Sequence, residues 1–266
     1  MGIRLPFLDR APVVSVLRLQ GAIGAGPRAG LSDQAMAPLI EKAFARGKPK
    51  AVCLVINSPG GSPVQSSLIA ARIRRLADDR KVPVYAFVED AAASGGYWIA
   101  AAADEIWADP GSIVGSIGVV SSGFGAQVFL ARQGIERRIH TAGRSKTMLD
   151  PFSEEKPEDV ERLNRILHRM HALFIEHVRS RRGDKLDTSA PGLFEGEFWL
   201  GEEAREIGLI DGVGHIVPEM KRRFGRKVRF RRYEAKKGLL RRFGGAMISD
   251  ALGGLEEQAL WARYGL

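Results

Sequence analysis

The stretch that decides the fold reads Ala91-Ala92-Ala93-Ser94-Gly95-Gly96-Tyr97-Trp98-Ile99-Ala100. It follows the apolar run 82–88, which predicts a strand, and it opens an apolar segment that predicts a short helix over 95–103. The small residues leave room for another chain beside the turn, so Ser94 is presented as a nucleophile would be. A Ser-Gly-Gly sequence is also what an ordinary turn looks like.

A second glycine-rich turn, Asn57-Ser58-Pro59-Gly60-Gly61, follows the apolar run 51–56. It has a plainer interpretation as a strand-to-helix connection whose glycines take positive φ. If the two strands are neighbours in one parallel sheet, however, the two turns lie side by side. Backbone N–H groups that face outward from so tight a turn can hold an oxyanion.

Predicted strands and helices alternate along the chain, which indicates an α/β fold with a parallel sheet covered by helices. The predicted strands cover 13–19, 51–56, 82–88, 105–108 and 118–120. The predicted helices cover 33–46, 64–76, 95–103, 124–133 and about 157–182. The expected buried side of the last helix comprises Val160, Leu163, Leu167, Met170, Phe174 and Val178.

Length and composition indicate one globular domain with additions, because the chain has 266 residues of which 45% are hydrophobic. The single cysteine, Cys53, lies in an apolar strand and is interpreted as core packing. Charges and a proline interrupt residues 1–10, so neither a signal peptide nor a spanning helix is predicted there. We expect a cytoplasmic protein, with peripheral contact at the inner face of the membrane left open.

The net charge of +9 is concentrated in one segment. Residues 221–242 contain twelve Lys or Arg and one acid, Glu234, and an amphipathic helical pattern follows over 239–260. Such a segment can lie on an anionic membrane. The alternative is a helix docked on a neighbouring subunit beside a solvated basic face. Nucleic acid is not expected, because no recognition motif accompanies the charges.

Four ordered motifs make residues 13–217 resemble the S49 serine peptidases, the signal peptide peptidase A and SohB-like proteins of the ClpP/crotonase superfamily. The motifs are Asn57-Ser58-Pro59-Gly60-Gly61, Ala93-Ser94-Gly95-Gly96-Tyr97, the run 108–119 that contains Gly115-Ser116-Ile117-Gly118, and the run 201–211. The resemblance implies a repeated β-β-α spiral, with a lead segment at 1–12, the peptidase domain at 13–217 and a basic amphipathic extension at 218–266. It also implies a homo-oligomeric ring.

A serine hydroxyl needs a base to take its proton, and a lysine serves only when it is neutral, as burial in an apolar pocket makes it. Lys146 stands between an Ala-Gly turn and an apolar Met-Leu pair, although a lone lysine of this kind is usually an exposed loop residue. The resemblance implies that Gly143-Arg144-Ser145-Lys146, followed by Pro151-Phe152, carries the base. Ser145 would orient Lys146, and His140 is the runner-up base for a Ser-His-Asp relay.

The expected reaction is peptide hydrolysis by a Ser94–Lys146 dyad, with the N–H groups of Gly61 and Gly95 as the oxyanion hole. The expected substrate groove is formed by Gly60, Ser62, Ser116, Ile117 and Gly118. Family analogy suggests extended hydrophobic peptides, such as signal-peptide remnants or membrane-protein fragments. This chemistry requires no metal and no other cofactor.

Other classes of function stay open on the sequence. A crotonase-like acyl-CoA enzyme shares the fold and the oxyanion hole, and an inactive membrane-associated oligomeric scaffold would use only the ring and the basic segment. His168 and His171 are one helical turn apart, but no zincin-like Glu accompanies them. The run 24–29 fits G-x-G-x-x-A loosely, with Pro27 removing an amide that a dinucleotide phosphate would need.

Overall fold

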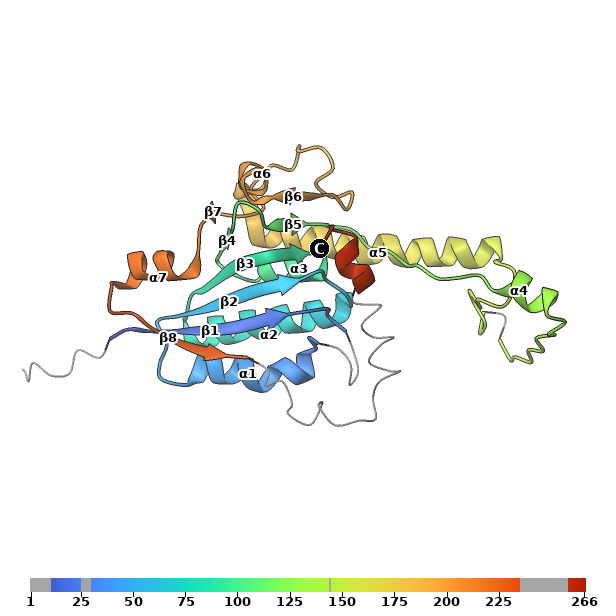
Figure 1. Ribbon diagram of the computed structural model, residues 1–266, viewed down its shortest axis with the longest axis horizontal. Coiled ribbons are helices and arrows are strands. Elements are labelled where there is room, and N and C mark those ends of the chain that lie inside the picture. Colours follow the sequence, from blue (N-terminus) through green and yellow to red (C-terminus); the bar gives the residue numbers. More distant parts are fainter. Residues whose placement is uncertain (1–10, 25–29, 144, 235–257) are drawn as a thin grey trace, which may run out of the picture.

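The computed structural model describes residues 11–24, 30–143, 145–234 and 258–266. An 8-stranded sheet runs through it in the order β6-β5-β3-β2-β1-β8, and β4 pairs with β3 and β7 (Figure 1). The strands are β1 (Val13–Gln20), β2 (Ala51–Ser58), β3 (Val84–Ala93), β4 (Glu105–Ala108), β5 (Ile113–Gly115), β6 (Phe198–Leu200), β7 (Gly212–Val213) and β8 (Arg229–Tyr233). Among these described strands, only the β5–β6 pair is antiparallel.

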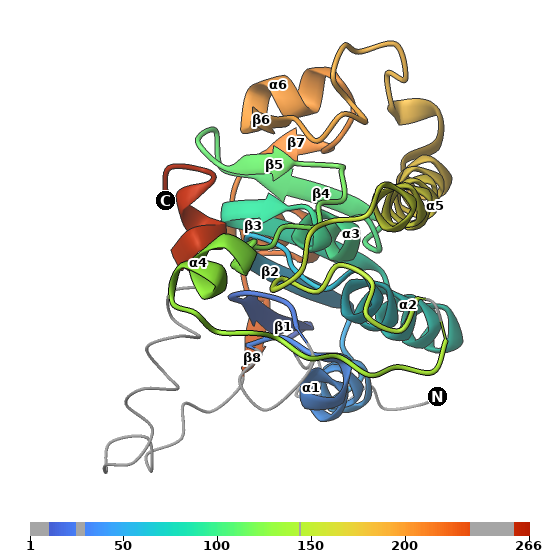
Figure 2. The ribbon, with the colours of Figure 1, turned by 90° about the vertical axis from the view of Figure 1, so that its right-hand side faces the viewer.

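Helices cover the sheet on both faces. They are α1 (Asp33–Ala45), α2 (Pro63–Arg80), α3 (Gly95–Ala100), α4 (Gln127–Arg132), α5 (Pro157–Arg182), α6 (Gly201–Glu206) and α7 (Ile216–Phe224). Figure 2 shows α1, α2, α3 and α5 on one side of the sheet. The main core lies between them and the strands, while α7 packs Met220 against Cys53 and other residues of the opposite face. Strand β2 is buried along its whole length, as expected for a central parallel strand.

Both helices that follow β1 and β2 begin where the sequence places a cap. The Ser32 side chain accepts a hydrogen bond from the Ala35 amide at the start of α1, and Ser62 does the same for the Gln65 amide at the start of α2. These side chains satisfy amides that have no partner inside the helix. The chain therefore turns from β2 into α2 directly after Gly61.

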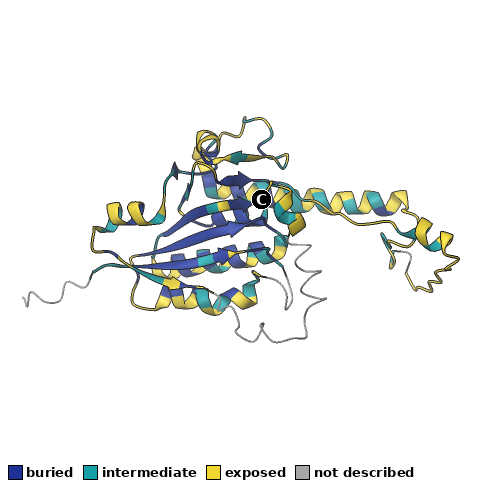
Figure 3. Ribbon diagram, viewed as in Figure 1, coloured by how far each residue is buried: buried dark blue, intermediate teal, exposed yellow. Residues whose placement is uncertain are grey.

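An arm, residues 124–156 with the first half of α5, extends away from the sheet (Figure 1). Figure 3 shows that its surface is mostly exposed. The arm has a small polar and aromatic cluster of its own, because Arg137 pairs with Asp150 at 2.8 Å and lies 4.9 Å above the Phe152 ring. Large apolar side chains nevertheless face outward: Phe124 is 93% exposed and Phe129 63%.

The predicted α/β class with a mostly parallel, helix-covered sheet is confirmed. The predicted strand at 118–120 is wrong, because the chain pairs earlier, through β5 with residues 91–93 of β3, and Ser116 then turns it away at a φ of +54°. The expected buried side of α5 is buried only at Phe174 and Val178, since the first half of the helix extends past the sheet. The helix predicted over 124–133 is present but shorter, since α4 covers only Gln127–Arg132.

The expected extension 218–266 begins with elements of the α/β unit, because α7 reaches Phe224 and β8 pairs in parallel with β1. The amphipathic helix expected over 239–260 lies largely outside the described residues, as do residues 1–10 and most of the run 24–29. Residues 258–262 are helical. No helix in the described ranges has both the length and the apolar character that crossing a bilayer demands.

Candidate active site

Ser94 lies at the junction of β3 and α3. Its backbone takes φ +52° and ψ −120°, a conformation that a non-glycine residue adopts only when its surroundings enforce it. The Ser94 amide donates to the Gly115 carbonyl at 2.8 Å, and the Ser94 carbonyl accepts from the Trp98 amide at 3.0 Å. A strained strand-to-helix turn of this kind lifts a serine hydroxyl out of the sheet edge.

The turn that follows β2 passes directly beneath Ser94. A Cβ atom on Gly60, where φ is +100°, would lie 2.8 Å from the Ser94 Cβ. On Gly96 it would lie 2.7 Å from the Ser58 carbonyl oxygen. The two glycine-rich turns therefore lie side by side, as predicted, and they do so because neither position carries a side chain.

The Gly61 and Gly95 amides lie close together at this junction. The position that a Cβ on Gly95 would take is 3.4 Å from the Gly61 nitrogen. Hydrogen bonds from the Ile23 amide to Gly60 and from the Ser62 amide to Ile23, both 2.8 Å, hold the loop that carries Gly61. Neither the Gly61 amide nor the Gly95 amide donates a hydrogen bond within the described part of the chain. Both donors are therefore available to a ligand beside Ser94.

Ser94 opens into a cleft of about 570 Å³. Of the expected groove residues, Ser62, Ser116 and Gly118 line it together with Gly61. Gly60 lies beneath Ser94, and the Ile117 side chain is fully buried in the core. Part of the remaining wall comes from distant segments that the sequence did not indicate: Glu195, Gly196, Leu260, Arg263 and Tyr264.

The structure does not bring the expected base to the nucleophile within one chain. Lys146 is exposed and does not line the Ser94 cleft. The segment that carries it belongs to the arm, well separated from α3 in Figure 1. Ser145 is half-buried beside it, and the runner-up base, His140, is also exposed on the arm. Arg144 lies outside the described residues.

A model of peptidase family S49 matches residues 77–222, more than half of the chain. The chain belongs to peptidase family S49. A protein of Brucella melitensis called Na(+)/H(+) antiporter NhaA is 49% identical over 95% of this chain, but the match covers only 37% of that protein. The chloroplastic serine protease SPPA of Arabidopsis thaliana is 34% identical over 76% of this chain and 29% of its own length. The chain thus spans well under half of either relative.

The S49 fold is also supported by solved structures. A lysine-to-alanine variant of the 1510-N membrane-bound stomatin-specific protease, in complex with a substrate peptide, superimposes with a TM-score of 0.55 and 18% identity. The superposition covers 85% of this chain and 94% of that one. At this level of identity, the likeness establishes the fold.

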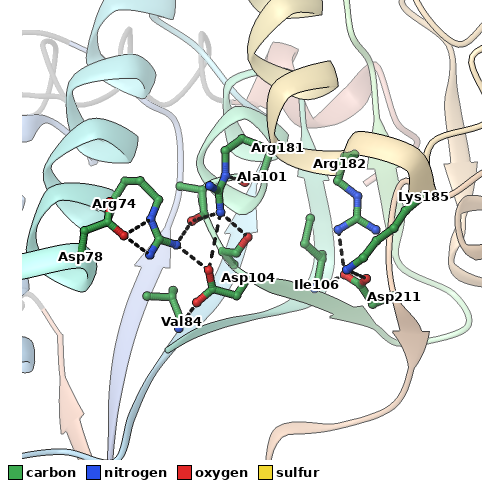
Figure 4. A network of polar contacts seen from close by, with 12 residues as sticks. Arg74, Asp78, Val84, Ala101, Asp104, Ile106, Arg181, Arg182, Lys185 and Asp211 are labelled. Atoms are coloured by element: carbon green, nitrogen blue, oxygen red, sulfur yellow. Dashed lines mark hydrogen bonds and ion pairs between the residues drawn. The ribbon is translucent and has the colours of Figure 1, made fainter. Parts of the chain in front are cut away.

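In this S49 chain, a polar network closes the carboxyl end of the helix that begins at Ser94 (Figure 4). Arg181 of α5 donates to the Ala101 and Ala103 carbonyls at 3.0 and 3.1 Å, and Arg74 of α2 donates to the Ala102 carbonyl at 3.0 Å. Burial, reinforced by the charge of Arg74, lowers the pKa of Arg181. Carbonyls that the helix leaves without partners are thus satisfied from two neighbouring helices.

Asp211 joins the end of α5 to β4. It accepts hydrogen bonds from Arg182 at 2.7 Å, from Lys185 at 2.6 Å and from the Ile106 amide at 2.8 Å. Burial alone would raise the pKa of Asp211, but the hydrogen bonds from Arg182 and Lys185 hold it below its ordinary value. The result is a rigid connection between α5, β4 and the segment before β7.

The histidines of α5 contact backbone carbonyls. His177 Nε2 lies 2.9 Å from the Trp98 carbonyl oxygen, and its ring stacks on the Trp98 ring at 4.9 Å. Burial lowers the pKa of His177. His171 contacts the Ile117 carbonyl, and His168 contacts the Asn164 carbonyl of its own helix. Across the described ranges, no cluster of three His, Cys, Asp or Glu side chains is arranged to bind a metal ion.

Proposed function

We propose that this chain is a serine endopeptidase in which Ser94 is the nucleophile and the Gly61 and Gly95 amides form the oxyanion hole. The observation that carries the proposal is the strained Ser94 turn, which faces two amides without a protein partner at the edge of a cleft. Membership of family S49 and a relative named as a serine protease support it. Hydrogen-bond donors that are already in place stabilise the charge of the transition state better than water does, because they need not reorient during the reaction.

We propose Lys146 as the general base, supplied by a neighbouring copy of the chain. The arm places Lys146 away from its own Ser94, and the exposed apolar residues Phe124, Val128 and Phe129 lie in or just before α4, at the far end of the arm. Large exposed apolar patches mark interaction surfaces. Burying the arm against a second copy would dehydrate the lysine, and dehydration favours the neutral amine that a base requires. A homo-oligomer would then complete each site.

The proposed reaction has two halves. Lys146 takes the proton of the Ser94 hydroxyl while Ser94 Oγ attacks the peptide carbonyl, and the carbonyl oxygen receives hydrogen bonds from Gly61 and Gly95. The protonated lysine then gives its proton to the departing amine as the C–N bond breaks. In the second half the neutral lysine takes a proton from a water whose oxygen attacks the acyl carbon. The lysine then returns that proton to Ser94 Oγ as the ester C–O bond breaks, which frees the carboxylic acid product. Ser-Lys pairs follow the same logic as serine triads.

The substrate would be an extended peptide lying between Ser62 and the segment from Ser116 to Gly118, where backbone groups of both banks can pair with it. Val119 and Val120 make part of the cleft apolar, which supports hydrophobic peptides such as signal-peptide remnants or membrane-protein fragments. We also propose that the basic segment 221–242 contacts the inner face of a membrane. Co-sedimentation with anionic vesicles, absent with neutral ones, would test that contact.

The decisive experiment uses a fluorophosphonate probe on the full chain, with Ser94→Ala and Lys146→Ala as variants. We expect labelling of the unmodified protein and of neither variant. Co-expression of the two variants should restore labelling on the Lys146→Ala chain, because its Ser94 then meets a lysine from the other copy. Equal labelling of all three proteins would disprove the dyad, and failure of the mixture would place the lysine in its own chain.

The same variants separate the other classes of function. A crotonase-like enzyme would bind a CoA thioester and keep its activity in the Ser94→Ala variant. A scaffold would form the folded oligomer yet never react with the probe.

A further inference from the structure

The segment 258–266 lies against the Ser94 cleft, close to the ends of β2 and β5. Leu260, Arg263 and Tyr264 line the same cleft as Ser94. Figure 2 shows the segment as the red helix, beside β3 and β5. The catalytic chemistry proposed above makes no use of this segment, so its position calls for a separate account.

Tyr264 reaches both banks of the cleft. Its hydroxyl lies 3.4 Å from the Pro59 carbonyl oxygen, at the end of β2, and 3.2 Å from Ser116 Oγ, at the end of β5. Its ring meets the Phe198 ring edge to face, at 5.3 Å between centroids and 79° between planes. Peptide substrate is expected to lie between these same two banks, so the tyrosine and a bound peptide compete for one space.

We propose that Phe198, Ser116 and the Pro59 carbonyl form a subsite for an aromatic side chain, and that Tyr264 occupies it as an internal competitor of peptide. The proposal rests on the peptidase function and names a substrate preference for it. The Phe198 ring supplies an edge-to-face partner. The hydroxyl and the carbonyl supply one donor and two acceptors, which suit a phenol.

The segment is placed as a competitor and not as a substrate. Residues 258–262 are helical, and the Tyr264 and Leu266 amides both donate to the Trp261 carbonyl. Backbone groups used within a helical turn are not available to pair with the banks of the cleft, as an extended peptide would. A single aromatic pair with two long hydrogen bonds is also weak enough for a peptide to displace. We expect the closed form, with Tyr264 in the subsite, to exceed the open form, with the subsite empty, about tenfold.

The test measures the binding of a fluorescein-labelled peptide of residues 258–266 to the full chain by fluorescence anisotropy, with Ser94→Ala present throughout to prevent turnover. Adding Tyr264→Ala should tighten binding about tenfold, because the apparent dissociation constant rises with the fraction of closed sites. Leu266→Ala is the matched control, since Leu266 is 53% exposed and does not line the cleft, and it should leave binding unchanged.

Changes on the receptor side should act in the opposite direction. Phe198→Ala added to the Tyr264→Ala protein should weaken binding about tenfold, and a peptide with alanine in place of its tyrosine should lose affinity equally. Phe198 is 45% exposed, so its removal leaves the core intact.

Three results would overturn the proposal. One is a Tyr264→Ala protein that binds peptide no better, which would make the segment a fixed wall of the cleft. The second is a Phe198→Ala protein that binds peptide normally. The third is cleavage within 258–266 by the chain with Ser94 intact, seen by mass spectrometry. Because the binding assay needs no catalysis, failure of fluorophosphonate labelling would refute the peptidase function separately.

Discussion

The surroundings of Ser94 and the surroundings of Lys146 differ in how far the chain itself fixes them. Below Ser94, Arg74 and Arg181 close the end of α3, and the Arg182–Asp211 pair joins α5 to β4 (Figure 4). On the arm, Lys146 is exposed, and apolar side chains elsewhere on the arm, such as Phe124 and Phe129, also face outward. Helix α5 joins the two regions, with its second half packed on α3 and its first half exposed (Figure 3).

The difference teaches that one chain prepares the nucleophile and the oxyanion donors but not the base. Strain at Ser94 is maintained by contacts that all come from the same chain, so that half of the chemistry is in place before any assembly. The arm lacks comparable contacts, and its exposed apolar surface is what an assembly would bury. Activity would therefore depend on protein concentration even where folding does not.

The largest expected effect separates the two halves of α5. Arg182 is 3% exposed and pairs with Asp211 at 2.7 Å, whereas Arg165 makes an exposed pair with Glu161. Arg182→Ala should lower the free energy of unfolding by about 3–5 kcal/mol, because it leaves the Asp211 carboxylate buried with less compensation. Arg165→Ala should cost at most about 0.5 kcal/mol. Urea unfolding monitored by circular dichroism measures both.

A comparable loss in the two variants would show that α5 is held equally along its length. Asp211→Asn provides a second check, since the amide keeps the shape but not the charge. It should be destabilising near neutral pH, because the pKa of Asp211 is held low in the folded state and its ionised form contributes stability there.

The next effect contrasts two glycines with positive φ. A Cβ on Gly61, where φ is +137°, would lie 2.0 Å from the Ile23 carbonyl oxygen, whereas one on Gly134 in the arm, at φ +68°, would meet nothing within 4 Å. Gly61→Ala should displace its amide and slow fluorophosphonate labelling by about 100-fold or more. Gly134→Ala should cost only the strain of its backbone, about 1–2 kcal/mol of stability. Normal labelling of Gly61→Ala would remove that amide from the oxyanion hole.

The sequence predicted the surroundings of Ser94 better than it predicted the arm that carries Lys146. The turns at Gly60 and Ser94 could be predicted because strand, turn and helix signals are local, and parallel neighbours bring such turns together. The place of Lys146 could not, because the described residues of 134–156 form no strand and contribute none of the core side chains. Its role stays a prediction.

Two other features escaped the sequence for different reasons. Strand β8 has the sequence Arg229-Phe230-Arg231-Arg232-Tyr233, and its cations hid the strand pattern inside a basic segment. Such charges are common on an edge strand, where they discourage pairing with a further strand. Tyr264 reaches Pro59 across 205 positions of sequence, and no periodicity reports a contact of that range.

The smallest expected effect concerns two histidines of α5. His177 packs against Trp98 of α3, whereas His168 is exposed. Burial lowers the pKa of His177 below its ordinary value, so the folded protein favours the neutral ring and the unfolded chain does not. The stability from this difference is fully present above the unfolded pKa of about 6.5 and is lost as the pH falls through the folded pKa. The difference between the urea midpoints at pH 7.5 and pH 5.5 should therefore become smaller in His177→Gln and stay unchanged in His168→Gln. Identical pH dependence in both variants would show that burial of His177 does not control its protonation, and that the two halves of α5 respond alike to acid.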